Sequence, residues 1–82
     1  MQIDILSPEQ NLYSGEIEYA KLPGIRGSFE VLKNHAPLIS ALGEGKLIIR
    51  GEDGLQEFLI KNGIVEVLNN RISVLTEGLV ED

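Results

Sequence analysis

Apolar and polar residues alternate along several short stretches of this chain, as they do in β-strands with one buried face. Ile3 and Ile5 share one side of the first stretch, and Ile17 and Tyr19 are expected to share one side of the second. Turn-forming residues separate the stretches, and this pattern predicts a single all-β domain, an antiparallel β-sandwich of about eight to ten short strands. The strands that can be placed are residues 2–7, 12–22, 28–32, 38–42, 46–50, 55–61, 64–68 and 71–75.

The turns between these stretches differ in the strength of their signals. Asn62-Gly63 is the strongest short hairpin signal and is predicted to pair the two strands that flank it. Residues 51–54 predict a four-residue hairpin loop. Gly15 predicts a bulge or a close approach within the second strand. Residues 76–82 are acidic and are expected to be frayed.

A region between residues 22 and 42 combines two stiff corners. Pro23 holds φ near −65° and Gly24 can take a positive φ, so these residues predict a type II turn. Gly27 is a second permissive point, and a Cβ at either glycine is expected to clash. Pro37 belongs to the second corner, which contains His35, the single histidine of the chain. Two short apolar segments between stiff polar corners favour a docking surface over a catalytic pocket.

The charge balance argues against several classes of partner. Thirteen acidic residues outnumber seven basic ones, which gives a formal net charge of −6. The basic residues are scattered singly, whereas a nucleic-acid surface needs clustered positive charge, so no nucleic-acid partner is expected. No apolar run approaches the roughly 20 residues of a membrane-spanning helix, so direct insertion into a membrane is not expected either.

The residues needed for catalysis or metal binding are largely missing. There is no cysteine, and His35 is the only imidazole base. A triad could draw on Ser28, Ser40 or Ser73, but nothing in the sequence places any of them beside His35. One histidine without cysteine almost excludes a zinc site. We therefore expect a non-catalytic protein with no metal or cofactor.

Two interpretations of His35 remain open at this level. In one, its ring caps a nearby carbonyl group in the corner. In the other, it is an exposed interface residue that uses its flat ring and two-sided hydrogen bonding.

Several motifs follow one another in a characteristic order, and together they resemble a known family. From about Ile3 to Thr76 the chain is similar to the N-terminal β-sandwich of the epsilon subunit of the rotary ATP synthase, called delta in mitochondria. The motifs that carry the resemblance are Tyr13-Ser14-Gly15, Leu22-Pro23-Gly24-x-x-Gly27, His35-Ala36-Pro37-Leu38-Ile39, Asn62-Gly63-Ile64-Val65-Glu66-Val67 and Ile72-Ser73-Val74-Leu75.

The resemblance implies a place and a mechanical role. It implies a rotor subunit at the foot of the central stalk, a monomer within the complex, between the gamma subunit and the membrane c-ring. Such a subunit couples proton flow to ATP synthesis at the cytoplasmic face of the bacterial cell membrane. Most bacterial members continue into a C-terminal helical hairpin that restrains ATP hydrolysis. This sequence ends at Asp82 in the manner of a short form, so that restraint is not expected of these residues.

The resemblance also assigns individual surface positions. Ser7, His35 and Ser40 match positions that face gamma, and Arg26, Ser28 and Glu30 match the region that meets the c-ring. The family often has an acidic residue at the position of Ser28, and here the acid lies two positions later, at Glu30. Because side chains of a strand alternate, this shift keeps the acid on the same face, and Glu30 is the candidate for that contact.

A carrier domain for biotin or lipoate is the alternative reading. Such domains are also acidic and all-β, and they carry a modified lysine at an exposed hairpin tip. Lys61 precedes Asn62-Gly63 and could occupy such a tip, but its neighbours Ile60 and Asn62 do not match the usual surroundings of that lysine.

Overall fold

The computed structural model describes residues 1–80, which form eight strands and no helix. Each stretch predicted from the alternation corresponds to one observed strand, so the all-β prediction is confirmed. The strands are β1 (Gln2–Leu6), β2 (Asn11–Gly24), β3 (Gly27–Leu32), β4 (Leu38–Leu42), β5 (Gly45–Gly51), β6 (Gly54–Ile60), β7 (Gly63–Leu68) and β8 (Arg71–Thr76).

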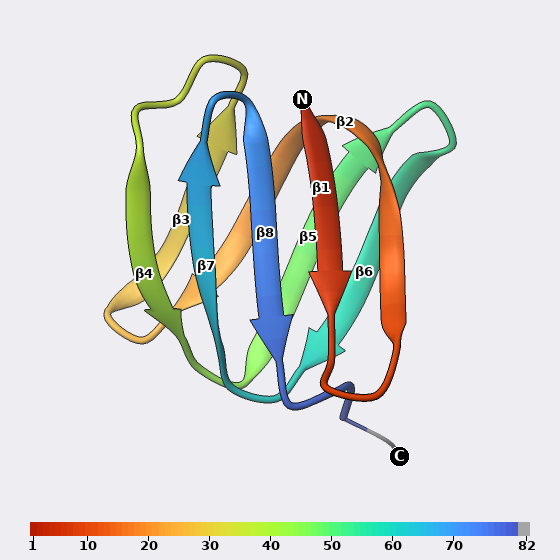
Figure 1. The fold of residues 1–82 in the computed structure, drawn as a ribbon, viewed down its shortest axis with the longest axis vertical. Helices are drawn as coiled ribbons and strands as arrows, with labels where there is room; N and C mark the ends of the chain where they lie inside the picture. Colours follow the sequence, from red (N-terminus) through yellow and green to blue (C-terminus); the bar gives the residue numbers. More distant parts are fainter. Residues whose placement is uncertain (81–82) are drawn as a thin grey trace.

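The strands lie in two layers that face each other across the core (Figure 1). The front layer has the order β4-β7-β8-β1 and continues into the first part of β2. The back layer contains β3, the second part of β2, β5 and β6. The strand pairs of this described region are antiparallel except for β1 with β8, which run parallel. These two strands come from opposite ends of the sequence, so no short hairpin constrains their direction.

Strand β2 joins the two layers. Its first part pairs with β1, and its second part pairs with β5 and β3. The register against β5 shifts between Ile17 and Tyr19, which makes Glu18 the extra residue of a bulge. A bulge bends a strand and increases its twist, and here it lets β2 pass from one layer to the other (Figure 1). The alternation predicted around Ile17 is therefore wrong, because Ile17 and Ala20 are both buried.

Gly15 marks the close approach rather than the bulge. A Cβ atom at this position would lie 2.9 Å from the hydroxyl of Tyr13. The Tyr13 ring in turn packs against Phe58 of the back layer, with the ring centroids 5.5 Å apart.

The core lies between the layers and is built from the inward-facing residues of nearly every strand. Its fully buried members include Ile3 and Ile5 of β1, and the neighbouring strand contributes Ile72 and Val74. From the back layer come Ala20, Leu22, Val31, Leu47, Ile49 and Ile60.

The turn predicted at Pro23-Gly24 lies two residues later in the structure. Gly24 pairs with Gly27 at the end of the β2–β3 ladder, and the connection consists of Ile25 and Arg26. Gly27 has a φ of 128°, whereas Gly24 is not among the residues with positive φ. A type II turn at Pro23-Gly24 would have removed the Pro23↔Ser28 and Gly24↔Gly27 pairs. The strands instead remain paired through these residues, and the chain turns after Gly24.

The hairpin predicted at Asn62-Gly63 is wrong. Strand β6 pairs with β5 and strand β7 with β4 and β8, so Asn62 leads the chain from the back layer to the front layer. Gly63 has a steric role instead: a Cβ there would run into the carbonyl oxygen of Leu75.

Two other connections are tight hairpins. Asn69 and Asn70, with φ of 51° and 60°, join β7 to β8. Positive φ at both central residues suits a two-residue hairpin turn. Between β5 and β6, Gly51 pairs with Gly54, so that loop has two central residues rather than the four predicted.

The fraying predicted for residues 76–82 is wrong for residues 76–80. Thr76 belongs to β8 and is only 2% exposed. Beyond it, the N–H of Val80 donates to the Leu59 carbonyl (2.7 Å), and the N–H of Lys61 donates to the Gly78 carbonyl (2.9 Å). The segment is ordered because it pairs with the end of β6. Residues 81–82 lie outside the described part of the chain.

Candidate docking surface

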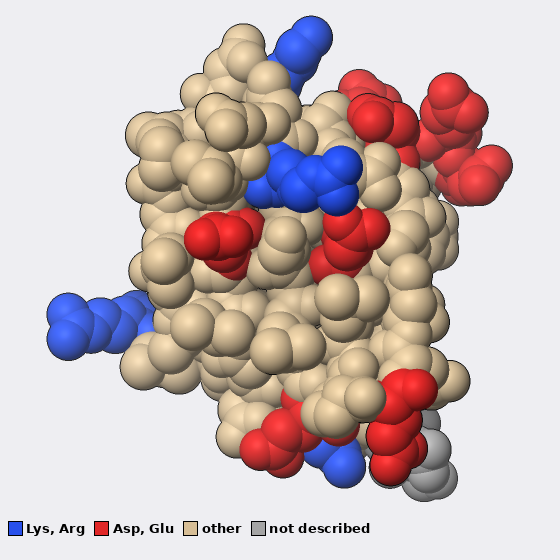
Figure 2. All heavy atoms as spheres, viewed as in Figure 1, with Lys and Arg blue, Asp and Glu red and all other residues tan. Residues whose placement is uncertain are grey.

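Apolar side chains cover much of the outer side of the front layer. Ile39 of β4 is 68% exposed. The residues that alternate with such outward-facing side chains point into the core. The register places Ala41 beside Ile64 and Ile64 beside Leu75 in one row across three strands. We call this surface the front face, and its apolar members are Leu6, Ile39, Ala41, Ile64, Leu68 and Leu75. Figure 2 shows a broad band without charged side chains across its lower half.

A small polar network crosses the front face above this band. The Arg71 guanidinium lies 3.0 Å from the Asp4 carboxylate, and the Ser14 hydroxyl donates to the same carboxylate at 2.7 Å. The hydrogen bond from Ser14 is the main cause of a lowered Asp4 pKa; partial burial opposes it, and Gln2 and Arg71 add to it. Asp4 is therefore held ionised and paired, and the exposed Glu66, beside Ile39 in the register, adds a second carboxylate to this face.

The corner that contains His35 lies at the upper end of the front layer. The His35 ring is half-buried, and its Nδ1 atom lies 2.7 Å from the Ala36 carbonyl oxygen. The contact expected for a capping histidine is thus present, and the part of the ring that remains accessible leaves an interface role open. Asn34, the preceding residue, has a φ of 66°.

The three residues assigned to a gamma-facing surface do not form one cluster. Ser7 lies in the β1–β2 turn, at the opposite end of the front layer from the β3–β4 corner (Figure 1). Its hydroxyl and backbone N–H both contact the Gln10 carbonyl. Ser40 is half-buried on β4 and pairs with the buried Val65, so its side chain lies on the core side of the strand, opposite Ile39. The three residues thus lie at the two ends of the front layer and on its edge strand, β4.

The three residues assigned to the c-ring lie together on β3 and its turn. Arg26 is exposed in the β2–β3 connection, and Ser28 and Glu30 are exposed on one side of β3. Glu30 accepts a hydrogen bond from the Tyr19 hydroxyl at 3.1 Å. Desolvation, and then this bond to Glu30, raise the pKa of Tyr19.

Sequence reasoning missed two groups of exposed apolar residues. Ile25 is 66% exposed at the tip of the β2–β3 connection, and it was overlooked because the turn was placed at Pro23-Gly24. The front face was missed as well, although its signal was present. Residues 64–68 and 71–75 carry apolar residues in both phases of the alternation, which indicates strands covered on both sides.

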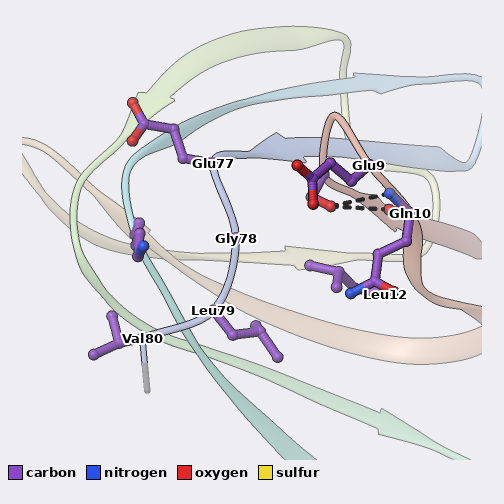
Figure 3. A pocket seen from close by; sticks show the side chains of 9 residues that line it. Glu9, Gln10, Leu12, Glu77, Gly78, Leu79 and Val80 are labelled. Carbon is purple, nitrogen blue, oxygen red and sulfur yellow. Dashed lines mark hydrogen bonds between the residues drawn. The ribbon is translucent and has the colours of Figure 1, made fainter. Parts of the chain in front are cut away.

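A hollow lies at the lower end, between the β1–β2 turn and the C-terminal segment (Figure 3). Glu9, Gln10 and Leu12 form one wall, and the segment from Glu77 to Val80 forms the other. Within residues 1–80, no group of three histidine, cysteine or acidic side chains is arranged to hold a metal ion. No helix in this part of the chain has the length and apolarity to cross a membrane.

Lys61, the candidate of the carrier-domain reading, does not lie at a hairpin tip. Its backbone N–H is bonded to Gly78, and the strands on either side of it are unpaired with each other. The structure therefore does not support the carrier-domain hypothesis, which needs this lysine at an exposed hairpin tip.

Comparison with known proteins gives consistent matches over nearly the whole chain. The family model described as ATP synthase, Delta/Epsilon chain, beta-sandwich domain matches residues 1–82. The ATP synthase epsilon chain of Leptospira interrogans serovar Lai is 42% identical over 84 residues, which cover 100% of this chain. The chain spans 66% of the length of that relative. The epsilon chain of Caulobacter vibrioides is 35% identical over 99% of this chain and 94% of its own length.

Solved structures show the same fold at low sequence identity. A chain of the Euglena gracilis mitochondrial ATP synthase superposes with a TM-score of 0.87 at 18% identity, covering 95% of this chain and 51% of its own. A chain from the central stalk and c-ring of the Tetrahymena thermophila mitochondrial ATP synthase gives 0.82 at 16% identity, covering 98% and 65%. The match of the family model to every residue, together with these relatives, shows that the chain belongs to the family of ATP synthase delta/epsilon chain β-sandwich domains.

Proposed function

We propose that this protein acts as a non-catalytic central-stalk subunit of a proton-driven ATP synthase, linking the gamma subunit to the membrane c-ring. Family membership supports the assignment, as does the similar fold of a chain from the Tetrahymena central stalk and c-ring. In this role it is a peripheral component at the cytoplasmic face of a bacterial cell membrane.

The front face is the proposed gamma-docking surface, and its exposed apolar side chains carry the proposal. Contiguous apolar patches on small acidic proteins are expected where another protein covers them. Ile39 and Ile64 project from adjacent strands, and the His35 corner leads into β4 just before Ile39. On this face Asp4 is already paired with Arg71, whereas the exposed Glu66 lies directly beside Ile39 in the register. A partner docked there therefore has to offer a basic or hydrogen-bonding group to the Glu66 carboxylate.

The β2–β3 connection is the proposed contact with the c-ring. It projects at the lower end of the sandwich (Figure 1), with Ile25 and Arg26 at its tip. Ser28 and Glu30 follow on the exposed side of β3. Its charged and polar side chains suit a partner surface built from polar loops, and Ile25 adds an apolar contact beside them.

The mechanical part of the role follows from the packing. Close-packed protein interiors have low compressibility, and the two layers enclose one continuous apolar core. A domain of this kind transmits torque between two partners with little internal deformation.

Binding to the isolated gamma subunit tests the proposal, with two variants of matched exposure. Ile39→Lys on the front face should weaken binding at least about tenfold, equivalent to ~1.4 kcal/mol. Leu55→Lys, on β6 of the back layer and 59% exposed, should leave binding unchanged. Both variants should keep the parent melting temperature, because both side chains face solvent. Equal binding by the two variants would rule out the front face as the docking surface.

A further inference from the structure

Two asparagines from turns far apart in the sequence bind each other at the upper end of the molecule. The backbone N–H of Asn34 donates to Oδ1 of Asn70 at 2.6 Å. In return, Nδ2 of Asn70 donates to Oδ1 of Asn34 at 2.9 Å. The pair connects the β3–β4 corner to the β7–β8 turn, which lie side by side in Figure 1.

The backbone explains why asparagine suits both positions. Asn34 and Asn70 have φ of 66° and 60°, a left-handed conformation that glycine and asparagine tolerate better than other residues. Glycine would satisfy the backbone at either position but has no side chain to make these hydrogen bonds. Asparagine therefore meets the conformational requirement and supplies the link.

Asn70 is also bonded through its backbone. Its carbonyl accepts a hydrogen bond from the N–H of Gln2 at 3.0 Å, which ties the turn to the start of β1. The corner itself has less support of its own: Lys33, Ala36 and Pro37 are exposed. Its local backbone bond runs from the N–H of His35 to the carbonyl of Leu32, at 3.1 Å.

We propose that Asn70 is a positioning residue, which holds the His35 corner and the start of β4 in the geometry that docks onto gamma. This proposal rests on the function proposed above. The corner leads directly into Leu38 and Ile39, so its orientation sets where the first apolar residues of the front face lie. A loop that is already ordered loses less conformational entropy when it binds a partner. Loss of the link should therefore weaken binding without removing any contacting side chain.

The chain offers a matched control in the same turn. Asn69 has a φ of 51°, and its side chain makes no hydrogen bond with any part of residues 1–80. Asn69→Gly and Asn70→Gly therefore impose the same backbone change, and only the second removes the link. Asn70→Asp keeps an oxygen for the Asn34 N–H, and the Asn34 amide can turn its nitrogen toward the new carboxylate.

Two measurements on these variants test the proposal: amide hydrogen exchange of Asn34, and binding to the isolated gamma subunit. We expect Asn70→Gly to speed exchange of the Asn34 N–H at least tenfold and to weaken gamma binding at least threefold. Asn69→Gly should match the parent in both, and Asn70→Asp should restore most of the protection.

The outcomes separate this inference from the proposed function. Unchanged Asn34 exchange in Asn70→Gly would show that the link does not hold the corner and would overturn the inference. Faster exchange with parental gamma binding would overturn the positioning role. If Ile39→Lys also left gamma binding unaffected, the front face would be ruled out as the docking surface. The exchange result would still show whether Asn70 holds the corner.

Discussion

Gly24 and Gly27 face each other at the end of the β2–β3 ladder, but they are glycines for different reasons. A Cβ at Gly24 would lie 2.7 Å from the carbonyl oxygen of Gly27 and 3.1 Å from the Phe29 ring. At Gly27 a Cβ would meet nothing within 4 Å, so the clash expected there is wrong. Its φ of 128° is what favours glycine.

This difference predicts the effect of substituting Gly24. Gly24→Val should lower the free energy of unfolding by more than ~1 kcal/mol, because the backbone oxygen of Gly27 cannot move aside without breaking the ladder. Gly43→Val is the control at the same end of the molecule, since the nearest atom to its Cβ, from Ile25, is 3.6 Å away. Urea denaturation measures both, and equal midpoints would contradict the steric argument.

At the scale of elements, the end of β8 continues into a segment that joins the two layers. The buried Thr76 hydroxyl donates to the Asn62 carbonyl at 2.8 Å and accepts from the Gly78 N–H at 3.3 Å. Beyond it, Leu79 forms an antiparallel bridge with Ile60 of β6. One side chain thus fixes the point at which the chain leaves the front layer for the back layer.

Replacement of Thr76 tests this junction. Thr76→Val keeps the shape but removes the hydrogen bonds to the Asn62 carbonyl and from the Gly78 N–H, which should cost about 0.5–1.5 kcal/mol each. The amides of Lys61 and Val80 should also exchange faster, because the segment they hold is released. Thr76→Ser retains the hydroxyl and should preserve the protection of both amides. Unchanged exchange in Thr76→Val would show that the β6 pairing is independent of Thr76.

At the scale of the whole molecule, β2 contributes to both layers and its bulge lies where it passes between them. The core has contributions from both ends of β2 and from both layers, so partial unfolding of one layer would expose the inner side of the other. The proposed torque-transmitting role also requires that the two layers do not separate under load.

This arrangement predicts a single cooperative unfolding transition. Tyr13 and Tyr19 are the two tyrosines of the chain, which has no tryptophan, so each can be observed alone in a single Tyr→Phe variant. Tyr13 packs between the layers, and Tyr19 lies on the outer side of the back layer beside Glu30. Fluorescence of each tyrosine and far-UV circular dichroism should give the same midpoint in urea. Separate midpoints would show that the layers unfold independently.

The placement of strands was predictable from the sequence because alternation is a local property. Each stretch with period-two patterning became a strand, and the Asn69-Asn70 and Gly51–Gly54 connections formed hairpins where turn residues stood between two such stretches. The motif order also sufficed to identify the family. The candidate surface positions were found through that resemblance, and their interface roles remain predictions.

The pairing of strands was decided by the tertiary structure. Asn62-Gly63 has a stronger hairpin signal than Asn69-Asn70, but it connects the layers, because β7 finds its partners in β4 and β8. The parallel β1–β8 pair, the bulge at Glu18 and the burial of Thr76 depend in the same way on residues distant in sequence. A local pattern specifies which side of a strand is apolar. Which strand covers that side, and which apolar side is left open as the front face, depends on how all eight strands pack together.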